Sequence, residues 1–181
     1  MADAIARRPV TVTATPWLRS LPASAKFILR GDPDALAAAG QRLGLALPTS
    51  ACRAAANGAR AGLWLGPDEF LLLAPENEAT AVATDLAAAF GVLPHSLVDV
   101  SHRQVTLELN GPQAEWLLGA QCPLPLDLRA FSVGMCTRTV FAKAEIVLWR
   151  TAPETFHMEV ARSFTQYVVD LLHEIARESV A

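Results

Sequence analysis

A strand that passes directly into a helix lies just past the middle of the 181-residue chain. From Val105 to Leu109 apolar and polar residues alternate, which is the pattern of a β-strand with one buried face. Gly111 then permits a tight turn, and Pro112 suits the first position of a helix because its missing N–H would have no intrahelical partner there. We therefore expect this strand to be followed at once by a helix over 112–120.

The same pattern occurs near the start of the chain. Phe27–Arg30 is typical of a short strand, and Asp32 and Pro33 follow it as a capping residue and a helix opener. In each half an irregular stretch, a β-hairpin and a second helix come next. Three residue pairs keep nearly the same separation in sequence: Pro33 with Pro112, Trp64 with Trp149, and Phe70 with Phe156. We infer an α+β fold of two similar strand-helix-hairpin-helix units with mostly antiparallel sheets; the alternative is that two unrelated hairpin-and-helix units look alike.

Local signals predict the remaining boundaries. Frequent prolines disfavour a helix in 1–26, so we expect an extended N-terminal arm there, a first unit over 27–96 and a second over 97–181, packed as one compact subunit. Ser163 and Gln166 predict a capping box at the C-terminal helix. The other expected elements are a helix from Pro33 to a stop at Gly44, an irregular stretch over 45–61, a hairpin of 63–65 with 70–73, a helix over 76–90, and strands over 137–142, 145–150 and 156–160.

Composition narrows the class of protein. A net charge of −3 provides no basic patch for nucleic acid, and no run approaches the ~20 apolar residues of a membrane span. Three cysteines without paired spacing indicate neither a disulfide framework nor a zinc site, so we expect a cytoplasmic protein. Charged residues make up only 18% of the chain, as expected for one component of a stable complex.

Known catalytic and cofactor motifs are missing from the sequence. The chain has no GxGxxG after a strand, no GxxxxGK[ST] and no GxSxG, so we expect it to bind neither dinucleotide nor ATP by those routes. Ser101 and His102 are adjacent, and neighbours in a strand point to opposite faces, which is wrong for a nucleophile and its base. The four histidines show no metal-ligand spacing.

Three charged residues remain as candidates for contact with a ligand or a partner. Glu145 precedes the apolar run 146–148, where partial burial would raise the pKa of its carboxyl group; the alternative is a solvated hairpin end. Arg103 and Arg138 are candidates for salt links to an anion or to a partner protein.

Three segments resemble a known family. Residues 43–48 (LGLALP), 63–73 (LWLGPDEFLLL) and 98–102 (VDVSH) are similar to the γ subunit of heterotetrameric sarcosine oxidase, and the similarity runs from about Phe27 to the C-terminal helix. The passage from Asp99 to Pro112 is also similar to the glycine-cleavage aminomethyltransferase and its folate-binding relatives. The second resemblance implies an aminomethyltransferase-like fold.

The first resemblance implies a non-catalytic γ subunit that assembles with α, β and δ subunits. Such a complex converts sarcosine to glycine and hydrogen peroxide, with formaldehyde or methylenetetrahydrofolate as the one-carbon product. The resemblance places FAD, FMN, NAD, tetrahydrofolate and zinc on the other subunits and no cofactor in this chain. Where aminomethyltransferases carry paired aspartates this chain has Ala144-Glu145, so the folate carboxylate is changed in type or missing. Two alternatives stay open: a stand-alone folate-binding aminomethyltransferase-like protein and a folate-sensing binding module.

Overall fold

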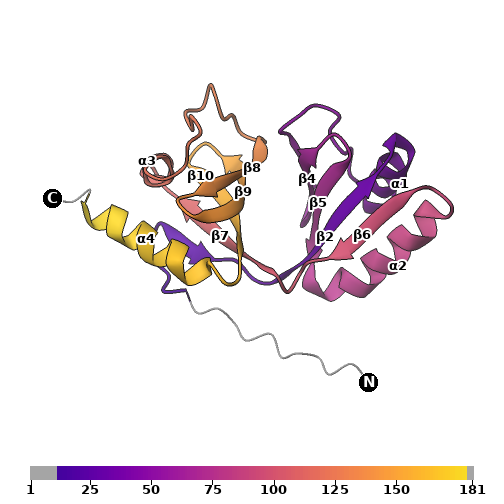
Figure 1. Cartoon of the computed structure of the whole chain (residues 1–181), viewed down its shortest axis with the longest axis horizontal. Helices are drawn as coiled ribbons and strands as arrows, with labels where there is room; N and C mark the ends of the chain where they lie inside the picture. Colours follow the sequence, from indigo (N-terminus) through magenta and orange to yellow (C-terminus); the bar gives the residue numbers. More distant parts are fainter. Residues whose placement is uncertain (1–11, 179–181) are drawn as a thin grey trace, which may run out of the picture.

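The computed structural model describes residues 12–178, which form two antiparallel five-stranded sheets facing each other, with helices on their outer sides (Figure 1). The first sheet has the order β3-β4-β5-β2-β6, made of Ala54–Asn57, Arg60–Gly66, Glu69–Pro75, Ser24–Gly31 and His95–Asp99. The second has the order β1-β7-β10-β9-β8, made of Leu18–Ser20, Gln104–Asn110, Thr155–Ala161, Ala144–Ala152 and Cys136–Phe141. The expected α+β class with antiparallel sheets is confirmed.

Helices α1 (Pro33–Leu43) and α2 (Ala79–Phe90, after the short 3-10 helix η1, Glu76–Glu78) cover the first sheet. Helices α3 (Ala114–Gly119) and α4 (Thr165–Glu178) cover the second. The two sheet orders correspond strand by strand, because β2, β5, β4 and β3 hold the places of β7, β10, β9 and β8. Each half therefore repeats one arrangement of strands and helices.

The edge strand beside β2 and the one beside β7 come from different places in the chain. In the first sheet β6 follows α2 and pairs with β2, whereas in the second sheet the same place beside β7 is taken by β1, from the start of the chain. The expected arm over 1–26 thus contributes a strand to the second sheet; its residues 1–11 lie outside the described residues. The expected boundary between 96 and 97 falls inside β6, because this strand still pairs with the first sheet.

Several local predictions are confirmed by the backbone. The Asp32 side chain accepts a hydrogen bond from the amide of Ala35 at 2.8 Å, and Gly44 ends α1 in the left-handed conformation with φ of 68°. The hairpin of β4 and β5 forms across the turn 67–68, as the sequence predicts.

Other local predictions are wrong. Helix α3 begins at Ala114 and not at Pro112, because Gly111 closes a turn by accepting a hydrogen bond from the Ala114 amide at 2.9 Å. Strand β3 lies inside the stretch expected to be irregular, held by its pairing with β4. The capping box is not made by Gln166, whose amide donates to Asp170 at 2.8 Å.

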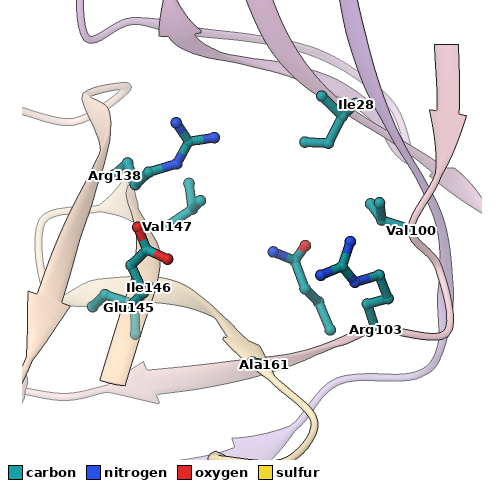
Figure 2. Close-up of a pocket in the computed structure, with 9 residues that line it drawn as sticks. Ile28, Val100, Arg103, Arg138, Glu145, Ile146, Val147 and Ala161 are labelled. Carbon is teal, nitrogen blue, oxygen red and sulfur yellow. The ribbon is translucent and has the colours of Figure 1, made fainter. Parts of the chain in front are cut away.

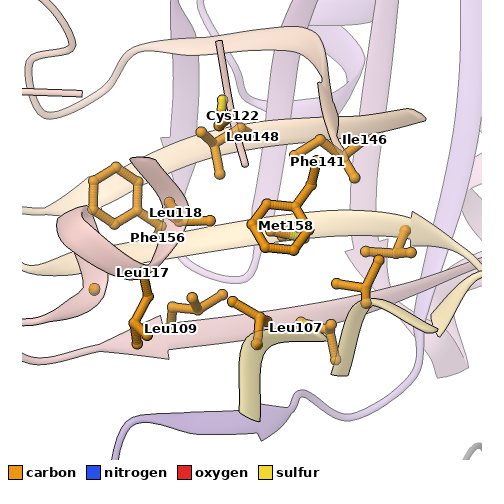
Figure 3. Close-up of a cluster of buried hydrophobic side chains, with 14 of the residues drawn as sticks. Leu107, Leu109, Leu117, Leu118, Cys122, Phe141, Ile146, Leu148, Phe156 and Met158 are labelled. Carbon is orange, nitrogen blue, oxygen red and sulfur yellow. The ribbon is translucent and has the colours of Figure 1, made fainter. Parts of the chain in front are cut away.

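Three apolar layers hold the fold together. The outer layer of the second unit lies between its sheet and helices α3 and α4 and includes Leu107, Leu118 and Phe156 (Figure 3). An equivalent layer packs α1 and α2 on the first sheet. A third, smaller cluster lies between the two sheets; its fully buried members are Ala61, Leu63, Leu71, Val100, Cys136 and Val147. The central strands therefore bury both faces, and the inner faces join the two units.

A buried arginine orders the loop between α3 and β8. Arg150 of β9 is 1% exposed and donates to the carbonyl oxygens of Leu126 at 2.6 Å and Phe131 at 2.9 Å. Its guanidinium also lies 4.6 Å from the ring centre of Phe156 and 3.2 Å from a carboxylate oxygen of Glu115. The side chain thus supplies hydrogen bonds that this irregular segment does not obtain from a strand or helix.

Candidate functional site

A pocket of about 290 Å³ opens between the two sheets, beside their shared apolar cluster. Its aliphatic wall includes Ile28 of β2, Val100 from the turn after β6, and Val147 of β9. The pocket draws residues from both units, so it exists only because the inner faces of the sheets meet.

All three charged candidates from the sequence line this pocket. Arg103 projects into it from the turn between β6 and β7, and Arg138 and Glu145 lie on the opposite wall (Figure 2). In the β8–β9 ladder Arg138 pairs with Val147 and Val140 with Glu145, so the two charged side chains share the inner face of the second sheet. The structure thus brings together residues that are up to 42 positions apart in sequence.

Arg138 is held by a carboxylate from the other sheet. Its Nη2 donates to Glu69 at 2.7 Å, and Nη2 of Arg30 donates to the second oxygen of the same carboxylate at 2.6 Å. Burial raises the pKa of Glu69, but the hydrogen bonds and charges of the two arginines outweigh it and hold the pKa below its usual 4.5. This three-residue link joins the sheets beside the pocket, which Arg138 lines.

Arg103 and Glu145 are both exposed, and neither forms a hydrogen bond or ion pair through its side chain with another residue in 12–178. The possibility that Glu145 is partly buried is therefore wrong, and the solvated hairpin end is what the structure shows. Sequence reasoning missed Gln104, a third polar residue of the wall: its Oε1 is buried and accepts no hydrogen bond within the described part of the chain. The only signal for it was its place at the start of an alternating strand.

A buried ion pair lies behind the pocket. Lys26 of β2 contacts Glu159 of β10, and each side chain is 2% exposed. Thr106 of β7 accepts from the Lys26 ammonium at 2.8 Å and donates to the other Glu159 oxygen at 2.9 Å. Because Lys26 and its partners come from different sheets, these contacts fix how one unit sits on the other. The sequence offered no sign of this pairing.

The Asp-x-Ser-His segment is a structural turn. Ser101 is buried, its Oγ donates to Asp99 at 2.5 Å, and it accepts from the Lys26 amide at 2.9 Å. His102 is exposed in the same turn. Both residues lie outside any strand, so the argument that strand neighbours point to opposite faces does not apply to them. The Ser101 hydroxyl is nevertheless unavailable as a nucleophile, because it is hydrogen-bonded to Asp99 and to the Lys26 amide.

Metal-ligand clusters and membrane-crossing helices are both absent from residues 12–178. Within that range no three histidine, cysteine or acidic side chains converge as metal ligands. None of its helices is both long enough and apolar enough to cross a membrane.

Comparison with known proteins gives matches along nearly the whole chain. The model of the "Sarcosine oxidase, gamma subunit family" matches residues 30–178. A sarcosine oxidase subunit gamma from Corynebacterium sp. (strain P-1) is 35% identical over 188 aligned positions, covering 100% of this chain and 91% of the relative.

Two solved structures share the fold. Heterotetrameric sarcosine oxidase from Corynebacterium sp. U-96, in complex with pyrrole 2-carboxylate, contains a chain that matches with a TM-score of 0.84 and 34% identity, covering 91% of this chain and 85% of that one. Glycine cleavage system aminomethyltransferase T from Bartonella henselae matches with a TM-score of 0.65 and 15% identity, covering 86% of this chain and 44% of that one. The second likeness concerns the fold alone.

Proposed function

Because the chain belongs to the sarcosine oxidase gamma subunit family, we propose that it is the γ subunit of a heterotetrameric complex that oxidatively demethylates sarcosine to glycine. The observation that carries this proposal is the match to a chain of a heterotetrameric sarcosine oxidase, at 34% identity and a TM-score of 0.84. Its partners are then the α, β and δ subunits.

Within that complex we propose a non-catalytic role for this chain. The groups on the inner faces that could do chemistry are largely occupied by each other: Ser101 binds Asp99 and Lys26 binds Glu159. FAD, FMN, NAD, tetrahydrofolate and zinc would accordingly be held by the other subunits, and hydrogen peroxide with formaldehyde or methylenetetrahydrofolate would be their products. A cytoplasmic location is also part of the proposal, supported by three free cysteines in the described residues.

Co-expression of the four subunits tests the proposal. We expect omission of this chain to prevent complete assembly or to abolish sarcosine turnover, and adding the purified chain back should restore it. A His102→Ala variant should assemble and turn over sarcosine like the unmodified complex, because a non-catalytic chain needs no chemistry from this exposed histidine. A full complex that forms and works without the chain would contradict the assignment.

A tetrahydrofolate titration separates this proposal from a stand-alone folate-binding aminomethyltransferase-like protein and from a folate-sensing module. We expect calorimetry on the isolated chain to show no heat of tetrahydrofolate binding. Saturable binding with folate-dependent methyl transfer by the chain alone would instead support the aminomethyltransferase-like protein.

A further inference from the structure

The pocket between the sheets contains polar groups of opposite character whose hydrogen-bonding capacity is unused. Arg103 offers a guanidinium with several N–H donors, and Glu145 offers a carboxylate that only accepts. Neither side chain is paired with another residue of the described range. The charges that a ligand can reach are those of Arg103 and Glu145, because Oε1 of Gln104 is buried and has almost no accessible surface.

These groups require a ligand that carries both signs. A carboxylate would satisfy Arg103, whereas Glu145 needs N–H donors. A simple anion would face the Glu145 carboxylate unfavourably, and a simple cation would leave Arg103 unpaired. Arg138 adds little to anion binding, because its guanidinium is already held by Glu69 at 2.7 Å.

The pocket also limits the size of the ligand. Its volume of about 290 Å³ is at the lower end of the range for small-molecule sites. Ile28, Val100 and Val147 provide an aliphatic wall against which a methyl group or a short side chain can pack. The site is thus small, dipolar and apolar on one side.

We propose that this pocket binds a small zwitterionic amino acid, with the carboxylate on Arg103 and the amino group directed to Glu145. The ligand class follows from the charges and size of the pocket. The choice of glycine and sarcosine as probes rests on the proposed function, because they are product and substrate of the complex.

Ligand-observed NMR on the isolated full-length chain tests the proposal with four probes: glycine, sarcosine, acetate and methylamine. We expect glycine and sarcosine to bind at millimolar concentrations or below. Acetate and methylamine each lack one charged group, so they should bind at least about tenfold more weakly, as expected for the loss of a charge-assisted hydrogen bond. Acetate binding as tight as glycine binding would overturn the proposal, as would no zwitterion binding up to about 10 mM.

Matched variants locate the ligand. Arg103→Gln and Glu145→Gln should each weaken glycine binding by about tenfold or more, since each removes one charge from an exposed position without a structural partner. The controls Arg129→Gln and Glu154→Gln change exposed residues outside the pocket and should have no effect. Unchanged binding in both pocket variants would overturn the assignment. Failure of this binding test leaves the subunit assignment intact, because assembly and turnover are measured separately.

Discussion

Replacing Lys26 by methionine should destabilise the protein by about 3–5 kcal/mol, the cost of leaving a buried carboxylate without its counter-charge. Lys26 and Glu159 are both 2% exposed, so water cannot replace the lost ammonium. The Glu159 carboxylate would keep only Thr106 as a hydrogen-bond donor from the cluster described here, at 2.9 Å. Urea denaturation of the isolated chain measures the effect directly. In a thermal melt the same loss should lower Tm by about 2–4 °C for each kcal/mol.

Two further variants make this prediction specific. The chain has one other lysine, the exposed Lys143, and Lys143→Met should change the free energy of unfolding by less than about 0.5 kcal/mol. The double variant Lys26→Met/Glu159→Met should be more stable than the sum of the two single losses implies, because it removes both buried charges. A loss below about 1 kcal/mol in Lys26→Met, or strict additivity in the double variant, would refute the interpretation of this pair as mutually dependent.

Three other predictions concern packing, pH and thiol reactivity. Gly40→Ala should lose about 1–3 kcal/mol in a urea titration, because its methyl group would lie 2.7 Å from a main-chain oxygen, whereas Gly119→Ala meets nothing within 4 Å and should lose nothing. The pKa of Glu69 is lowered in the folded state, so its charge stabilises the protein above the usual pKa of 4.5. The difference in free energy of unfolding between wild type and Glu69→Gln should therefore shrink as the pH falls below that value. A difference that does not change with pH would contradict this. Burial raises the pKa of the Cys136 thiol to about 12. A thiol reagent at pH 8 should therefore modify the partly exposed Cys52 first and reach Cys136 only after unfolding. Equal modification rates of the two cysteines in the folded chain would contradict this prediction.

The predictions from sequence that are confirmed rest on short-range chemistry. The cap at Asp32 and the stop at Gly44 follow from backbone geometry that a few neighbouring residues determine. Alternation from Val105 to Leu109 identifies the face of β7 that packs under the helices, because a strand repeats every two residues. The expectation of a single buried face is wrong, because Thr106 on the opposite face is buried against the other sheet. By contrast, β3 consists of three alanines and an asparagine, and only its pairing with β4 shows that it is a strand.

The candidate site depends on contacts between residues that are distant in sequence. Arg103, Arg138 and Glu145 were each identifiable as charges beside apolar segments, but their common pocket results from how the two sheets pack. The Lys26–Glu159 pair joins residues 133 positions apart. Neither side chain has a local pattern that names its partner, so this interaction could be found only in the folded chain.

The positions of β1 and β6 set an order of events during synthesis. The first sheet has all its strands once the ribosome has passed Asp99. Strand β1 is made before any of them, yet its partner β7 appears only when Leu109 and its neighbours emerge. Strand β1, the first strand of the described residues, is therefore among the later ones to pair, and the first half folds while this segment is still unpaired at its N-terminal side. Joining α4 to β1 and opening the chain between β6 and β7 would remove this delay, because each sheet would then be encoded in one continuous stretch.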